Sequence, residues 1–483
     1  MKTKLLLTLI IAITLIFSIA VALDLSPFLR GPAPYFPDWR WDYNFVNTFP
    51  KIWFPITISA IILCIFYFVE KKGKKWIEKK EKIILPSFFL LYYLFQFAVL
   101  YFNRAGINSL LNRIINPGVN GYFTSALYVK DVPSFLKEFN SIVLSLYMHA
   151  QGHPPFSVLF FWIINKLFSF TPFFNPLTSE LIIKTDNIRS VWLTLPQSAK
   201  LGAIFVAVFI PMLVSLVSIL VYLVAKKIYG INTAFRSLIV LIFVPNILLF
   251  IPINDVFIVI FPLASIILLI NSIRNKQLIL SLLSGLLFSV GLYFSISLLP
   301  IFIIIIFILV KETNFKIKKS TNYIIFYLLG LLFIPVFLYV VLGFDTIRML
   351  KVLMSGLPEK RHYSTWVIYN LYDFFVFTGI PLTIGLIVLI CNQIMRLYRR
   401  LWKNVDLFFT GFILMLLILN FSGSVRGETG RIWIPFVPFM IMPVVNFLTV
   451  NKQVRLSTNQ FVLFVSIQLV VVLVLNEFWV ALW

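Results

Sequence analysis

Two of the three histidines, His149 and His153, lie in one short stretch that ends at Pro154 and Pro155. Proline fixes φ and lacks an amide hydrogen, so a helix can begin after this pair but cannot pass through it. The apolar run that follows, residues 156–170, spans about 15 residues, whereas a helix needs roughly 20 to cross a bilayer. The stretch therefore predicts a polar corner and a short re-entrant or interfacial helix, which would suit the floor of an active site at a membrane surface.

His149 and His153 are four residues apart, so on a helix they would share one face. Histidine pairs can bind zinc, but no further ligand follows at short spacing and no glutamate accompanies them as in a metalloprotease helix. Polar capping of an interfacial helix is a second interpretation. We favour a role in shaping or polarising a pocket, and we predict no metal site, with a bound divalent cation left open as an alternative.

A second candidate site combines arginines with glycines. Arg426 and Arg431 flank Glu428 in one segment whose two glycines permit a tight turn and a close ligand approach. Guanidinium groups bind phosphate through paired hydrogen bonds. The segment therefore predicts phosphate binding, with Trp433 beside it, although an internal Arg–Glu pair that closes the loop is the alternative. Arg361 lies in another basic segment and is a third candidate for an anionic ligand.

Candidate acids come from two places in the chain. Asp255 stands at the end of an apolar run, where a carboxylate is costly unless it is hydrated or paired. Asp131 and Glu138 lie in a long semi-polar segment before the histidines. The sequence holds no nucleotide-binding fingerprint and no serine nucleophile elbow. An enzyme of this composition would therefore draw on an activated substrate, and a lipid-linked phosphosugar can reach such a site through the membrane.

Composition places these residues in a membrane protein. Of the 483 residues, 60% are hydrophobic and only 12% are charged, which excludes an ordinary soluble domain. The formal charge of +23 does not indicate nucleic-acid binding, because the basic residues form short runs between apolar spans. The expected partners are membrane lipids, and no nucleic acid.

The order of apolar and basic segments predicts an all-α polytopic protein with about 13 crossings. Spans are expected at about 5–23, 52–69, 83–102, 201–225, 235–252, 256–272, 278–296, 297–311, 322–343, 367–391, 406–421, 432–450 and 460–480. We treat the first as a retained span, with a cleaved signal peptide as the alternative.

Basic runs then fall on the cytoplasmic side, which puts the N-terminus inside and the candidate site outside a plasma membrane. Three parts are expected. Residues 1–82 form two accessory spans with an external loop, residues 83–450 form a core, and residues 451–483 form a last span. The core carries a large external loop, 103–200, whose amphipathic pieces at 107–115 and 134–146 predict helices parallel to the membrane.

Three features of the core resemble the GT-C superfamily of integral-membrane glycosyltransferases. His153, Pro154 and Pro155 are similar to its His-Pro-Pro element, which closes the first large external loop. The run 224–230 and the next span, ending at Asp255, are similar to its following hairpin. The segment 426–433, with Pro435, is similar to a late motif of bacterial members. The resemblance covers about residues 83–450, and it is to the dolichyl-phosphate-mannose-type and lipid A aminosugar transferase-like branch.

The resemblance implies transfer of a sugar from a polyprenyl-phosphate donor to a glycan, lipid or protein acceptor on the outer face. A carboxylate would act as general base, and arginines would hold the leaving phosphate. The family's usual acid early in the loop has no counterpart in residues 116–122. Either another acid replaces it, with Asp131, Glu138, Asp38 and Asp42 as candidates, or the chain has lost that chemistry. A transporter or flippase, or a non-catalytic scaffold of envelope assembly, are the alternative functions.

Overall fold

The computed structural model describes residues 3–32, 38–45, 47–170, 191–314, 316–355 and 361–480. Helices make up about 80% of these residues. The two strands that they contain, β1 (Asp42–Tyr43) and β2 (Trp479–Val480), pair antiparallel, with Asp42 opposite Val480. The predicted all-α class is confirmed for the described part of the chain.

The α-helices and short 3₁₀ helices (η) follow one another along the chain. The first half contains α1 (Thr3–Ala22), η1 (Pro27–Arg30), η2 (Phe49–Lys51), α2 (Trp53–Lys72), α3 (Lys74–Phe102), α4 (Asn108–Ile115), α5 (Tyr122–Ala126), α6 (Val132–Ile142), η3 (Val143–Ser145), η4 (Met148–Gly152), α7 (Phe156–Ser169), α10 (Gln197–Tyr229), α11 (Ile231–Ile242) and α12 (Pro245–Leu249). The second half contains η6 (Asn254–Val256), α13 (Ile260–Asn275), α14 (Leu278–Phe294), η7 (Ile296–Leu298), α15 (Ile301–Glu312), α16 (Ile317–Leu342), α17 (Thr346–Ser355), α18 (Tyr363–Thr378), α19 (Ile380–Tyr398), η8 (Trp402–Asn404), α20 (Leu407–Ser422), α21 (Thr429–Ile432), η9 (Ile434–Phe436), α22 (Val437–Val450) and α23 (Thr458–Phe478).

Eight helical segments of the described residues are long and apolar enough to cross a membrane. They are Thr3–Ala22, Phe49–Lys72, Lys74–Phe102, Gln197–Tyr229, Asn254–Asn275, Ser320–Leu342, Ile380–Tyr398 and Thr458–Phe478. Five more apolar helices are shorter, namely Phe156–Ser169, Ile231–Ile242, Leu278–Phe294, Leu407–Ser422 and Ile434–Val450. The chain is therefore built as an α-helical membrane protein, whereas the expected number of crossings stays a prediction.

Two expected spans are broken in the structure. The run 235–252 divides into α11 and α12, because Pro245 starts a new helix and Pro252 ends the second one. The run 367–391 divides into α18 and α19 at Gly379, whose φ of 108° is not helical, and Pro381 follows it. Elsewhere a helix extends beyond the prediction, since α3 begins at Lys74 and includes the basic residues expected in a loop.

The segment 103–200 contains helices close to those expected. The amphipathic pieces correspond to α4 and α6, and the short apolar run after Pro155 is α7. Two polar residues that also suggested an external loop, Asp186 and Arg189, lie outside the described residues. The orientation of these helices to a membrane remains a prediction.

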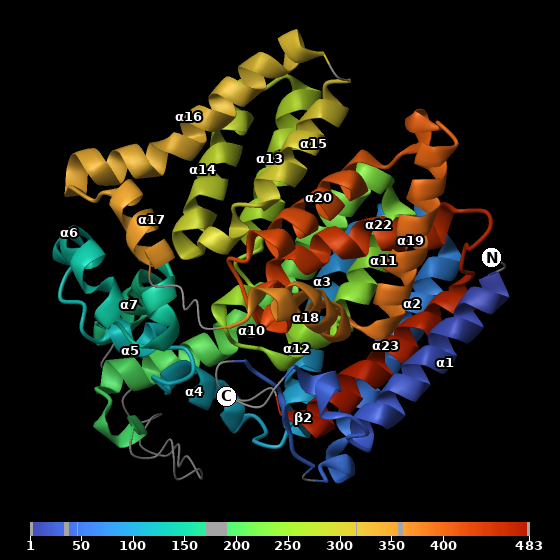
Figure 1. Cartoon of the computed structure of the whole chain (residues 1–483), viewed down its shortest axis with the longest axis horizontal. Helices are drawn as coiled ribbons and strands as arrows, with labels where there is room; N and C mark the ends of the chain where they lie inside the picture. Colours follow the sequence, from blue (N-terminus) through green and yellow to red (C-terminus); the bar gives the residue numbers. More distant parts are fainter. Residues whose placement is uncertain are drawn as a thin grey trace.

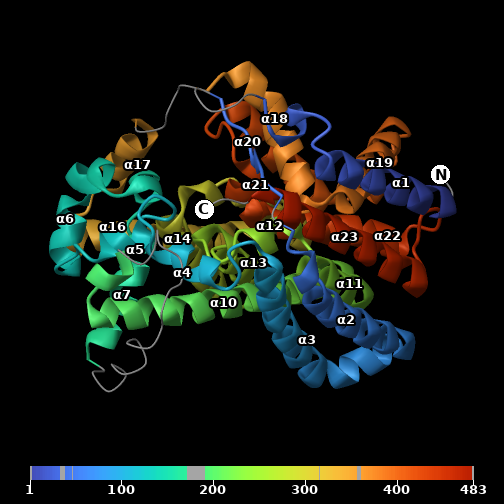
Figure 2. The ribbon, with the colours of Figure 1, turned by 90° about the horizontal axis from the view of Figure 1, so that it is seen from below.

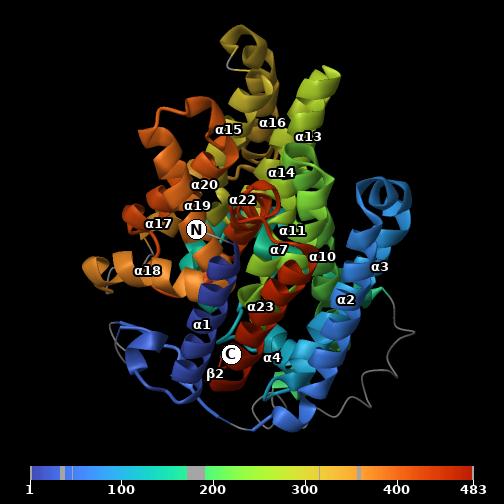
Figure 3. The ribbon, with the colours of Figure 1, turned by 90° about the vertical axis from the view of Figure 1, so that its right-hand side faces the viewer.

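Polar contacts gather at two opposite ends of the helix bundle. At one end Arg236 pairs with Glu70, Lys226 pairs with Glu81, and Arg274 pairs with Glu312. At the other end β1 pairs with β2, and Asn103 Nδ2 donates to Asn476 Oδ1 over 3.0 Å. Figure 3 shows β2 and α4 at the lower end, with the turn between α2 and α3 pointing away from them.

Helices distant in sequence form the core of the bundle. α1 packs along α23 and α19 (Figure 1), so the first span lies against the last one. The 33-residue α10 contacts α3, α7, α11 and α13. In Figure 2 it runs below α13, with α7 near one of its ends. These contacts bring η4, η6 and α21 together at the end that carries β1 and β2, and the candidate site lies there.

Candidate functional site

Arg431 links the histidine corner to the glycine-containing segment. Its Nη1 lies 3.0 Å from Nε2 of His149, and its Nη2 lies 2.8 Å from Oε2 of Glu428. Arg431 and Glu428 are one helical turn apart on the start of α21, while His149 comes from η4. The side chains of Arg431 and Glu428 are only 7% and 13% exposed. The structure thus unites three predicted site residues from segments about 280 residues apart.

Two further arginines continue the cluster. Arg361 Nη2 lies 3.5 Å from Oε1 of Glu428, and its Nη1 donates to the carbonyl of Arg426 over 2.6 Å. Arg426 Nη1 donates in return to the carbonyl of Arg361 over 2.8 Å. Gly427, at φ 99°, makes this approach possible, because a Cβ there would lie 2.4 Å from Arg361 Nη1. Glu428 therefore pairs with two guanidinium groups, and Arg426 is linked to them through the backbone of Arg361.

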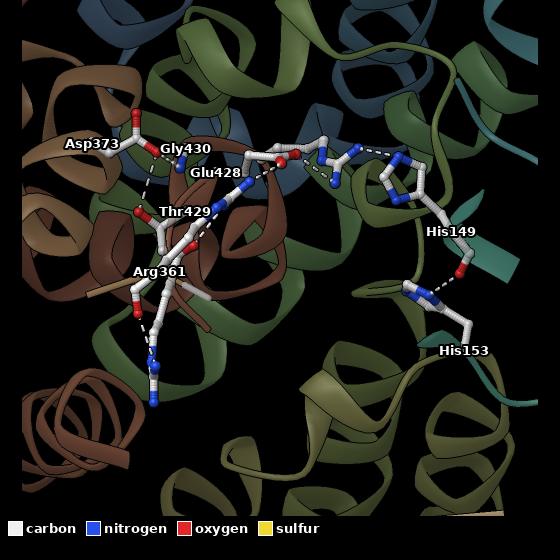
Figure 4. Close-up of polar contacts among 9 residues, drawn as sticks. His149, His153, Arg361, Asp373, Glu428, Thr429 and Gly430 are labelled. Atoms are coloured by element: carbon white, nitrogen blue, oxygen red, sulfur yellow. Dashed lines mark hydrogen bonds and ion pairs between the residues drawn. The ribbon is translucent and has the colours of Figure 1, made fainter. Parts of the chain in front are cut away.

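A carboxylate that the sequence analysis missed fixes the turn before Arg431. Asp373, buried in α18, accepts hydrogen bonds from the indole of Trp41 (2.6 Å), the amide of Gly430 (2.7 Å) and the hydroxyl of Thr429 (3.2 Å). Figure 4 shows its carboxylate pointing at Thr429 and Gly430, away from His149 and His153. Asp373 is thus a positioning residue. An acid within an apolar run was the signal that could have found it.

The two histidines lie on one 3₁₀ turn. Nδ1 of His153 is 2.9 Å from the carbonyl of His149 (Figure 4), and the ring of Tyr122 stands edge-on to His153 at 5.2 Å. Burial lowers the pKa of His153 to about 4, and the charge of Arg431 acts in the same direction. Burial and Arg431 also hold the pKa of His149 well below its usual value. Both imidazoles are therefore neutral near pH 7.

Asp255 is the predicted acid that lies beside the cluster. It is part of η6, which packs against η9 just after α21. Its charge interacts with those of Arg431 and Glu428, and Tyr122 interacts with Asp255 and Arg431 in turn. The side chain is half-buried. Asp255 is consequently placed where a carboxylate could take a proton next to an arginine-bound anion.

The other three predicted site residues are Asp131, Glu138 and Trp433, and each has different surroundings. Asp131 is the N-cap of α6, where its exposed carboxylate accepts a hydrogen bond from the amide of Ser134 over 2.8 Å. Glu138 lies on the exposed face of the same helix. Trp433 is fully buried against Phe374, with ring centres 5.7 Å apart. The structure does not bring Asp131 or Glu138 into the cluster, and it makes Trp433 part of the wall behind it.

Within the described ranges, no group of three or more His, Cys, Asp or Glu side chains is arranged to hold a metal ion. Comparison of the chain with protein-family models, with curated proteins and with solved structures found no match. The interpretation of the site therefore depends on its own geometry. That geometry combines three guanidinium groups, one ion-paired glutamate, two neutral imidazoles and one half-buried carboxylate.

Proposed function

We propose that the chain is a glycosyltransferase that moves a sugar from a polyprenyl-phosphate-linked donor to an acceptor on the outer face of a membrane. The observation that carries this proposal is the pairing of two guanidinium groups, those of Arg361 and Arg431, with the single carboxylate of Glu428, while Arg426 donates to the carbonyl of Arg361. Guanidinium groups recognise phosphate oxygens through directed pairs of hydrogen bonds. Because positive charge exceeds negative charge among these four side chains, an anionic ligand would complete the cluster.

The neighbouring groups supply the rest of the proposed mechanism. The arginines hold the phosphate and stabilise the charge that develops on it as the bond to the sugar breaks. Asp255 acts as the general base that removes the proton of the acceptor hydroxyl, which then attacks the anomeric carbon. His149 orients Arg431 through the 3.0 Å contact, and His153 supports the turn that carries His149.

The proposed orientation follows the basic segments. The end with Arg236, Lys226 and Arg274 would face the cytoplasm together with the N-terminus, because basic residues are retained on that side. The arginine cluster would then face outward. A donor carried by a lipid can diffuse to this end within the bilayer, and the acceptor can arrive from the aqueous side.

The test is release of polyprenyl phosphate from polyprenyl-phosphate sugars by the purified chain. Wild-type protein should release it in the presence of a hydroxyl-bearing acceptor, and Arg431→Met should not, since Met has a comparable length but no charge. Arg348→Met, which changes an exposed arginine of α17, is the control and should retain activity. Equal release by the wild type and Arg431→Met would refute the proposal.

A transporter for a lipid-linked or anionic solute is the second candidate, and the break between α18 and α19 favours it. Transporters use discontinuous helices to expose backbone groups near the middle of the membrane. At this break the carbonyl of Thr378 accepts a hydrogen bond from Nε2 of Gln468 in α23 over 2.6 Å. Proteoliposomes would separate the two functions. Movement of intact donor lipid between leaflets without sugar release would indicate transport.

A further inference from the structure

Buried polar atoms without a protein partner flank the arginine cluster. Asn254 is only 2% exposed, yet neither atom of its side-chain amide has a hydrogen-bond partner among the described residues. The amide nitrogen of Asn120 and the indole nitrogen of Trp433 share this condition, and both residues are equally buried. Such atoms also occur elsewhere in the described chain, but these three residues border the proposed site.

Their place follows from their neighbours. Asn254 directly precedes Asp255, Asn120 lies two residues before Tyr122, and Trp433 lies two residues after Arg431. Burial raises the pKa of Tyr122, the nearby Asp255 adds to this shift, and the nearby Arg431 opposes it. The elements η6 and η9, which adjoin Asn254 and Trp433, also pack together. The unpartnered groups thus lie within two residues of Asp255, Tyr122 and Arg431 in the sequence, on elements of which two pack together.

A buried amide without a partner destabilises a protein, because it gives up its hydrogen bonds to water and receives none in return. Most buried polar groups are paired, so an exception needs an explanation. Asn370 is the contrasting case in this chain. It is 1% exposed, and its Oδ1 accepts from Gly427 while its Nδ2 donates to the carbonyl of Val425. Asn165 and Asn246 share the unpaired state of Asn254, and Asn254 is the one of these three that directly adjoins a residue of the proposed site in the sequence.

We propose that Asn254, assisted by Asn120, binds hydroxyl groups of the sugar whose phosphate contacts Arg431. An amide offers both a donor and an acceptor, which suits the neighbouring hydroxyls of a sugar ring and not the phosphate itself. The inference rests on the proposed function and deepens it, because it divides the site into a phosphate part at the arginines and a sugar part at the asparagines. Asn254 then determines sugar specificity, since a site built for hydroxyl groups discriminates against ligands that lack them.

The first test compares thermal stability without any ligand. Asn254→Leu removes an unpaired amide, so its melting temperature should equal or exceed that of the unaltered protein. Asn370→Leu, the matched control, breaks two hydrogen bonds and should melt at a lower temperature. A loss for Asn254→Leu as large as that for Asn370→Leu, or failure to recover it folded, would mean that Asn254 is held by structural partners such as ordered water, and would overturn the inference.

The second test measures ligand binding to the purified chain, with inorganic phosphate and a panel of hexose and pentose 1-phosphates as probes. At least one sugar phosphate should bind the wild type more tightly than phosphate does. Asn254→Leu should lose about fivefold or more of that affinity and keep its affinity for phosphate. Asn254→Ser, which retains a polar group, should lie between them.

The outcomes separate this inference from the proposed function. If the wild type prefers a sugar phosphate and both variants keep that preference, the inference fails while phosphate recognition stands. If Arg431→Met binds phosphate as tightly as the wild type, the proposed phosphate site itself is wrong. If no probe binds the wild type more tightly than phosphate, the sugar part of the site is refuted.

Discussion

Nη1 of Arg431 lies 3.0 Å from Nε2 of His149, and this contact fixes where the imidazole carries its proton. A guanidinium group can only donate hydrogen bonds, so Nε2 must accept and the ring hydrogen resides on Nδ1. The lowered pKa of His149 agrees with a neutral ring. Histidine is therefore used here as an acceptor that orients a cation, and the protonated form would repel its own partner.

The acceptor role of His149 can be tested with glutamine and alanine. Glutamine carries an oxygen that can accept from Arg431, so His149→Gln should retain a measurable part of the sugar-transfer rate. His149→Ala removes the acceptor and should reduce transfer about 10-fold or more, as expected for loss of a hydrogen bond to a charged group. Release of polyprenyl phosphate provides the readout. Equal activities of the two variants would show that the contact has no role in transfer.

Asp255 is expected to be the general base. Asp255→Asn should lower the transfer rate about 10²–10⁴-fold while binding of inorganic phosphate stays close to that of the wild type. Glu138→Gln, on the exposed face of α6, is the control and should change neither quantity. A fully active Asp255→Asn protein would exclude Asp255 as the base, and loss of transfer in Glu138→Gln would move the base to the segment first suggested by sequence.

Asp373 should matter for stability as well as for transfer. Asp373→Asn replaces one acceptor oxygen with a donor that faces N–H and O–H groups of Trp41, Gly430 and Thr429. The expected cost is about 1–3 kcal/mol, seen as a lower denaturation midpoint, together with reduced transfer because Arg431 is no longer held.

The control for Asp373 is the helix cap Asp131. Asparagine caps helices about as well as aspartate, so Asp131→Asn should leave both stability and transfer unchanged. Unchanged stability of Asp373→Asn would contradict the positioning role. Loss of transfer in Asp131→Asn with normal stability would support Asp131 as the catalytic carboxylate.

The free energy of unfolding should decrease in acid because of His153. Its pKa is about 4 in the folded chain against a usual 6.5, so the unfolded chain binds a proton first as the pH decreases. Linkage then reduces the free energy of unfolding between about pH 6.5 and pH 4, with no contribution from this group above that range. Melting curves of the wild type and His153→Gln at several pH values would measure it. The wild type should show the steeper decline, and parallel declines would refute the assignment.

The order of apolar and charged segments predicted an all-α membrane protein, because an apolar segment inside a bilayer must form its backbone hydrogen bonds within a helix. The same order predicted one unbroken span at 235–252 and one at 367–391, and both predictions were wrong. Prolines and Gly379 interrupt the helices inside these apolar runs. Composition averages over such interruptions. Proline alone would not have located both breaks, because Pro86, Pro211 and Pro335 lie inside unbroken helices of the same chain.

The site residues also divide into those that the sequence could indicate and those that it could not. His149, Arg431 and Glu428 could be chosen by chemistry and by their position at the ends of apolar runs, but their pairing needed the packing of helices far apart in sequence. Asp131 and Glu138 were selected because they are acids in the expected loop, although solvent exposure and helix capping explain both. Asp373 escaped notice because its partners, Trp41 and Gly430, come from two distant segments.

The contacts between the first loop and the end of α23 also constrain how the protein assembles during synthesis. Thr48 donates from its backbone amide to Glu477 over 2.8 Å, across 429 residues. At roughly 5–20 residues per second, a ribosome needs about 20–90 s to make the chain between them. Until then β1 has no partner strand, whereas Trp41 can already bond to Asp373, which is made about 100 residues earlier. Protease added to chains arrested before α23 should therefore cut near Asp42, whereas the finished chain should resist cleavage there. The pairing of β1 with β2, close to the contact between Trp41 and Asp373, would therefore form only after α23 has been made.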